Sequence, residues 1–163
     1  MVPVVTVVAG IALVSCGGDE GAAPEPRVDL IPDALAAVEE YYGSPQEYFE
    51  VSATLDSVGF IVAVDDATAA EQGAYGADGT FTAPTDVGEA SGSTFGRDAI
   101  DVDGDRIFDQ VRDELGDPVI VDFAVQGGPD GAVIYDATIA SDEGGVLLVL
   151  LGPDGTINGV QGG

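Results

Sequence analysis

Regular alternation of apolar and polar side chains is the feature that most restricts what this chain can form. Four segments show it: 49–55, 58–64, 119–125 and 133–139. Because successive side chains of a strand point to opposite faces, this period of two predicts strands that are buried on one face. In the first segment, the predicted buried face consists of Phe49, Val51, Ala53 and Leu55. Residues 146–151, in contrast, are apolar throughout and predict a strand without a polar face.

A helical spacing of apolar residues precedes each pair of alternating segments. The first set is Leu30, Ile31, Leu35, Val38 and Tyr42, and the second is Ile107, Phe108, Val111 and Leu115. Gly43 and Gly116 follow the two sets, and glycine in that place is typical of a helix end. Asp29 is the candidate N-cap of the first helix, because its carboxylate can accept a hydrogen bond from a free backbone N–H.

The order of a helix followed by a meander therefore occurs twice. It predicts the fold class α+β, as two tandem helix-plus-antiparallel-meander units that form a sheet with helices on one face. The units are predicted at residues 29–83 and 100–163, with 84–99 as the linking loop. Short strings such as Gly43-Ser44-Pro45 and Gly116-Asp117-Pro118 recur in the same order. Chance recurrence of common turn tripeptides is the alternative explanation for these strings.

This architecture is similar to that of small tandem-domain exported proteins of bacteria. The resemblance is to PepSY-type modules and β-lactamase-inhibitory-protein-like folds, in which a helix that ends in Gly-X-Pro leads into a curled sheet. It covers residues 29–160 and implies a curled sheet. A concave sheet built from two such units has a shape suited to gripping a partner. The resemblance carries no functional residue over to this chain.

The N-terminal apolar run ends at the single cysteine, Cys16, and a polar, glycine-rich stretch follows directly. Residues 2–15 are too few to span a bilayer, but they have the length of the apolar part of a signal peptide. Leu13-Val14-Ser15-Cys16 resembles a lipobox, the site at which bacterial lipoprotein precursors are acylated and cleaved. The resemblance implies a signal peptide at 1–15, a lipid on Cys16 and a flexible tether at 16–28. A buried N-terminal strand with a chance cysteine is the alternative.

The composition excludes several classes of function. The chain has 30 Asp and Glu against four arginines, with a net charge of −26, so phosphate-rich nucleic acid is not an expected partner. It has no histidine and no lysine, which excludes His-containing catalytic triads, His-ligated zinc and Schiff-base chemistry. Two enzyme classes remain: those that use carboxylates alone and those that use a carboxylate-bound hard metal.

One acidic cluster resembles a calcium loop. Its candidate ligands are Asp101, Asp103, Asp105 and Asp109. Arg106 stands where such loops have glycine, and Arg112 where an EF-hand has its bidentate glutamate. The preferred interpretation is a helix start, with Asp103 or Asp105 as the N-cap.

The sequence therefore predicts an exported, highly acidic protein held at the outer side of the cell membrane by the lipid on Cys16. It is expected to bind an unknown protein or small ligand on its sheet face, without catalysis and without a cofactor. A calcium-binding surface module that uses residues 101–109 is the alternative, and a carboxylate-only hydrolase is the third hypothesis.

Overall fold

The computed structural model describes residues 24–116, 118–140 and 145–162. The predicted signal peptide, Cys16 and most of the predicted tether lie outside these residues. Two α-helices and three short 3-10 turns are described: α1 Ile31–Tyr42, α2 Gly104–Leu115, η1 Val28–Leu30, η2 Arg97–Ala99 and η3 Pro129–Gly131. The strands are β1 Glu47–Thr54, β2 Ser57–Val64, β3 Ala69–Gly76, β4 Phe81–Glu89, β5 Phe95–Gly96, β6 Val119–Gly127, β7 Val133–Ala140, β8 Val146–Leu151 and β9 Ile157–Gly162.

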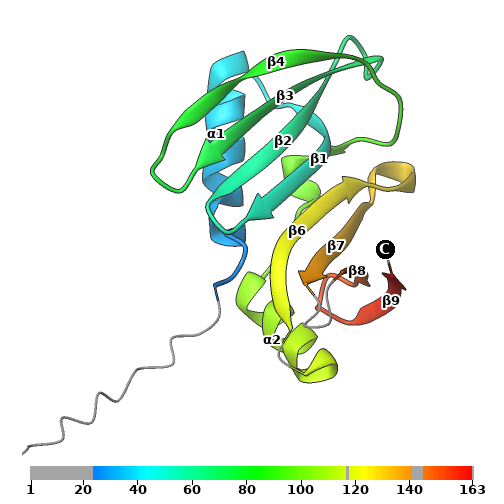
Figure 1. The fold of residues 1–163 in the computed structure, drawn as a ribbon. Helices are drawn as coiled ribbons and strands as arrows, with labels where there is room; N and C mark the ends of the chain where they lie inside the picture. The colour runs from blue at the N-terminus through cyan, green and yellow to red at the C-terminus, as the bar shows by residue number, and fades with distance from the viewer. Residues whose placement is uncertain (1–23, 117, 141–144, 163) are drawn as a thin grey trace, which may run out of the picture.

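All nine strands belong to one antiparallel sheet (Figure 1). Its order is β4-β3-β2-β1-β6-β7-β8-β9, and the short β5 pairs with the start of β1. Two meanders, β1–β4 and β6–β9, meet where β1 pairs with β6. Among the described residues, no helix is long and apolar enough to cross a membrane.

Both helices pack on the same face of this sheet. The helical residues predicted to face the core, Leu35, Val38, Phe108 and Val111, are all buried. They belong to one hydrophobic cluster together with core residues of β1, β2, β6, β7 and β8. Phe108 of α2 meets Phe123 of β6 edge to face, with ring centroids 6.0 Å apart.

The prediction of two helix-plus-meander units is wrong. The sheet is continuous, and the buried residues of both halves form one cluster rather than two. The physical reason is the pairing of β1 with β6, which runs from Glu50 opposite Gln126 to Thr54 opposite Asp122. This pairing places Val51 directly opposite Val125 and so joins the two apolar faces edge to edge. The result is a sheet-dominated fold with one core.

Three local details also differ from the sequence-based expectation. An irregularity between Tyr48 and Glu50 lets Tyr48 and Val51 both point into the core, so Phe49 leaves the predicted buried face. Leu55 lies beyond the end of β1 and is exposed. Asp29 lies within η1, and the N-cap of α1 is Leu30, without a side-chain hydrogen bond.

The boundaries of the ordered fold are wider than the predicted units. The segment 84–99, predicted as a linking loop, contains the second half of β4, then β5 and η2. At the N-terminal side, the N–H of Arg27 donates to the carbonyl of Thr54 at 2.8 Å, and Val28 is buried. The end of the predicted tether therefore packs against the sheet.

We predict that Phe108→Ala lowers the free energy of unfolding by about 3 to 5 kcal/mol, because it removes a fully buried ring. Since one core serves both meanders, β1–β4 and β6–β9 should unfold together. Urea unfolding followed by circular dichroism gives the energy, and NMR signals from the two meanders show whether they disappear at the same urea concentration. Val87→Ala, at a 55% exposed side chain on β4, is the control and should change stability by less than about 0.5 kcal/mol. Separate unfolding of β6–β9 would contradict the single core.

Candidate functional site

The predicted acidic cluster lies at the start of α2. Asp103 is the N-cap, and its Oδ1 accepts a hydrogen bond from the backbone N–H of Arg106 at 3.2 Å. Asp105 lies in the first turn, where a negative charge complements the helix dipole. Asp109 points toward Arg112, at 3.7 Å between Oδ1 and Nη1. Asp101 makes its hydrogen bond through the backbone: its N–H donates to the Tyr135 hydroxyl at 3.1 Å.

These contacts support the helix-start interpretation of the cluster. The Asp103 carboxylate is used in capping, a contact typically worth about 1 kcal/mol. In the described part of the chain, no group of three or more His, Cys, Asp or Glu side chains is arranged around a common metal position. Cys16, the predicted lipid attachment site, lies outside the described residues.

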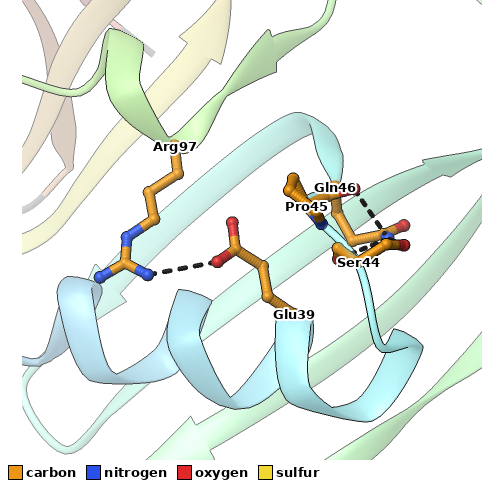
Figure 2. Close-up of polar contacts among 5 residues, drawn as sticks. All are labelled: Glu39, Ser44, Pro45, Gln46 and Arg97. Carbon is orange, nitrogen blue, oxygen red and sulfur yellow. Dashed lines mark hydrogen bonds and ion pairs between the residues drawn. The ribbon is translucent and has the colours of Figure 1, made fainter.

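A pocket of about 590 Å³ lies between the C-terminal half of α1, the start of β1 and η2. Figure 2 shows its main ion pair: Arg97 Nη1 lies 3.2 Å from Glu39 Oε2. Gln46, Glu47 and Asp98 add polar or acidic side chains to its lining, and Pro45 adds an apolar one. The ion pair ties η2 to α1, while the surplus of carboxylates makes the pocket a poor anion site.

Tyr48 lies beneath this region, with its ring packed near Phe95. Its hydroxyl is buried and has no hydrogen-bond partner among the described residues. Burial raises the pKa of Tyr48, the charge of Glu39 raises it further, and the charge of Arg97 lowers it in part. Tyr48 is therefore a neutral core residue with an unsatisfied hydroxyl.

The sheet face opposite the helices, which we call the open face, carries an unusual group of acids. On β7, Tyr135 and Ala137 point into the core, so Asp136 between them points to the open face. Asp136 is paired in register with Ala124 of β6 and with Leu150 of β8. Asp122 and Glu50 occupy open-face positions on β6 and β1. We call Glu50, Asp122 and Asp136 the acidic trio.

Apolar side chains of β7 and β8 lie on the same face as Asp136. We define the apolar margin by its members: Ile134, Val146, Leu148 and Leu150. Leu150 is half-buried, but Ile134 is 42% exposed, Val146 is 51% exposed and Leu148 is 36% exposed. Antiparallel sheets with one solvated face normally place polar residues there. Strand β8 is apolar on both faces, which is typical of a strand that is covered on both.

Asp136 itself is only 5% exposed, and no described residue donates a hydrogen bond to it. Burial, together with the negative charges of Asp122 and Glu50, raises the pKa of Asp136 to about 6. The pKa of Asp122 is also raised, first by burial and then by the charge of Glu50. At neutral pH the open face thus holds a largely buried negative charge that no described arginine pairs with.

The cations of this chain are engaged elsewhere. Arg27 pairs with Asp29 at 2.8 Å, Arg97 with Glu39, and Arg112 with Glu25. The pKa of Asp154 is lowered chiefly by hydrogen bonding from Thr156 and in smaller part by the charge of Arg106, which places this fourth arginine near the β8–β9 turn. The sequence has four cationic side chains in total, so three of them form ion pairs away from the acidic trio and the fourth lies near Asp154.

Sequence reasoning did not find the acidic trio, although a signal for it exists. In the segment 133–139, the residues between the predicted core residues are Ile134, Asp136 and Thr138. A carboxylate therefore lies between an apolar side chain and a small one on that face of the strand. The neighbouring segment 146–151 is apolar throughout, which indicates an apolar surrounding for that carboxylate. The spacing of acids along the chain predicted a cluster at residues 101–109. It contains no information about acids that lie on neighbouring strands of a sheet.

We predict that Asp136 makes the protein less stable as pH rises. Its folded pKa of about 6 lies above the unfolded value near 3.9, so the folded state holds the proton more tightly and its contribution is lost as pH rises through 6. The stability of Asp136→Asn relative to the natural protein should increase by up to about 3 kcal/mol between pH 3.5 and pH 7.5. Urea unfolding at several pH values measures this difference. Asp113→Asn, which removes one carboxylate at an exposed position on α2, is the matched control for the loss of a negative charge. A difference for Asp136→Asn that is flat or falls with pH would contradict the buried charge.

Comparison with known proteins shows the fold alone. No protein-family model and no curated protein matches the sequence. The structure is similar to the crystal structure of a candidate lipoprotein from Clostridium difficile 630, with a TM-score of 0.56. The match covers 88% of this chain and 97% of the other, at 13% sequence identity. A similar fold therefore also occurs in a protein of very different sequence.

Proposed function

We propose that this protein is an exported, lipid-anchored binding protein that captures a partner on the open face of its sheet and carries out no catalysis. The observation that carries the proposal is the exposed apolar margin around Asp136. Exposed apolar side chains gathered on one face of a protein are typical of interaction sites. The helices leave this face uncovered, so it is accessible to a partner.

Two observations support export and anchoring. Leu13-Val14-Ser15-Cys16 resembles a lipobox, and the similar structure from Clostridium difficile belongs to a candidate lipoprotein. The described fold begins to pack at Pro26, ten residues after Cys16. A short linker of that kind lets a strongly acidic domain remain at some distance from an anionic membrane surface.

The chemistry of the chain favours binding over catalysis. Because the chain has neither histidine nor lysine, general acid–base catalysis would depend on carboxylates. The acidic trio lies on an open strand surface and is flanked by the apolar margin, an arrangement that suits docking of a complementary surface. Carboxylate-only hydrolysis remains the third hypothesis, and the pocket beside Arg97 does not contain Asp122 or Asp136.

We predict that Cys16→Ala abolishes anchoring, because the thiol is the acylation site and the chain has no second cysteine. In a bacterial host, the natural sequence should be found in the membrane fraction with Cys16 as the modified N-terminal residue. The Cys16→Ala protein should remain unprocessed or soluble. Ser15→Ala, which keeps a small residue before the cysteine, is the control and should be processed normally. Membrane-bound protein without a lipid adduct, shown by intact mass, would refute the anchor.

We predict that a partner contacts the open face in cells. A photo-crosslinking residue is introduced by Leu148→p-benzoylphenylalanine on β8, and the matched control is Leu115→p-benzoylphenylalanine at the end of α2. Both leucines are 36% exposed, so the two probes differ in position and not in accessibility. Irradiation should give a specific adduct from position 148 and none from position 115. Equal labelling at the two positions, or no adduct from 148, would count against binding on the open face.

A further inference from the structure

We infer that the open face binds an arginine side chain carried on an extended segment of a partner protein, with an apolar residue two positions from that arginine. The inference rests on the proposed binding function and specifies the chemistry of the partner. It names Asp136 as the acceptor of the guanidinium group and the apolar margin as the contact for the neighbouring apolar side chain.

The first argument is charge complementarity. Asp136 is 5% exposed, receives no hydrogen bond from the described residues and lies near two further carboxylates. A buried charge without a partner is costly, and such a cost persists in proteins mainly where function requires it. Three of the four arginines pair with other carboxylates, the fourth, Arg106, lies near Asp154, and the chain has no lysine or histidine. A neutralising cation must therefore come from another molecule.

The second argument is spacing. Asp136 lies opposite Leu150 on β8, and Leu148 lies two residues along that strand, so Asp136 and Leu148 are diagonal neighbours. Diagonal neighbours on one sheet face are about 7 to 8 Å apart. In an extended segment, side chains two positions apart point to the same side at a separation of about 7 Å. One arginine and one apolar residue at positions i and i+2 of a partner segment thus match Asp136 and Leu148.

The third argument distinguishes arginine from other cations. Calcium requires six to eight oxygen ligands, and the described residues hold no group of three carboxylates around a common metal position. Lysine carries a compact, strongly hydrated charge that is costly to bury. The guanidinium group is planar and more weakly hydrated, and it forms two parallel hydrogen bonds with a carboxylate. Its flat surface also packs against aliphatic side chains such as those of the apolar margin.

The test uses two blocked peptides that differ in one charge. They are Ac-Leu-Ser-Arg-Ser-Leu-NH2 and the same peptide with citrulline, a neutral isostere, in place of arginine. Each is titrated at pH 7.5 into full-length protein that carries Cys16→Ala, and NMR shifts of backbone amides in β6, β7 and β8 are followed. Asp136→Asn and the control Asp113→Asn are titrated in the same way. Calcium chloride is titrated separately against sodium chloride at equal ionic strength.

We expect the arginine peptide to shift amides around Asp136 and to bind at least tenfold more tightly than the citrulline peptide. Asp136→Asn should remove this difference, whereas Asp113→Asn should preserve it. Because Asp136→Asn removes a destabilising buried charge at this pH, loss of binding cannot be ascribed to loss of the fold.

Three results would overturn the inference. Equal binding of the two peptides would show an apolar docking face without charge recognition, which leaves the proposed binding function intact. No binding of either peptide would refute the arginine-bearing segment as the partner, while the crosslink from position 148 still tests the face independently. One-to-one binding of calcium that Asp136→Asn abolishes would make the acidic trio a metal site.

Discussion

The pairing of β1 with β6 is the contact on which the rest of the structure depends. It joins two meanders that are distant in sequence, and it sets Val51 against Val125 so that one core forms beneath both helices. On the other face, the same pairing places Glu50 of β1 on one side of the sheet with Asp122 and Asp136, where the charges of Glu50 and Asp122 raise the pKa of Asp136. The core and the acidic trio are thus two consequences of one strand register, because a shift by one residue would exchange the two faces of each strand.

The open face departs from the rule that buried charges are paired, and this departure separates it from the other polar sites. At Glu39 and Arg97 an acid meets a base, and at Asp103 a carboxylate meets a backbone N–H. Each contact has a structural purpose within the fold. Asp136 has neither kind of contact among the described residues, and no described arginine pairs with it. A residue that costs stability in the isolated protein and faces outward is explained most simply by a contact made with another molecule.

The sequence allowed local structure to be predicted better than assembly. Helical spacing located α1 and α2 to within a residue or two, and Gly43 and Gly116 do end them in the left-handed conformation. The pairing of β1 with β6 joins segments that are distant in sequence, and the periodic pattern of apolar residues does not indicate which strands pair. Two units were therefore expected where one core exists. The irregularity after Tyr48 moved Phe49 off the buried face for the same reason, since alternation assumes an unbroken strand. For the site, acids that are close in sequence predicted a cluster at Asp101–Asp109. Asp136 differs from other acids through its neighbours on adjacent strands, which the sequence does not place beside it.

The overall charge and the acidic trio would act on different steps of binding. A net charge of −26 attracts a basic partner from a distance and raises the association rate, but ions at physiological strength screen this attraction beyond about 8 Å. Asp136 is buried and therefore screened much less, so a contact with it acts mainly on how long the complex lasts. Salt should consequently change the speed of capture more than the preference for arginine. This division also explains how so acidic a surface can be selective: most of its carboxylates contribute to a diffuse field, while one buried carboxylate between apolar side chains fixes a particular position for a cation.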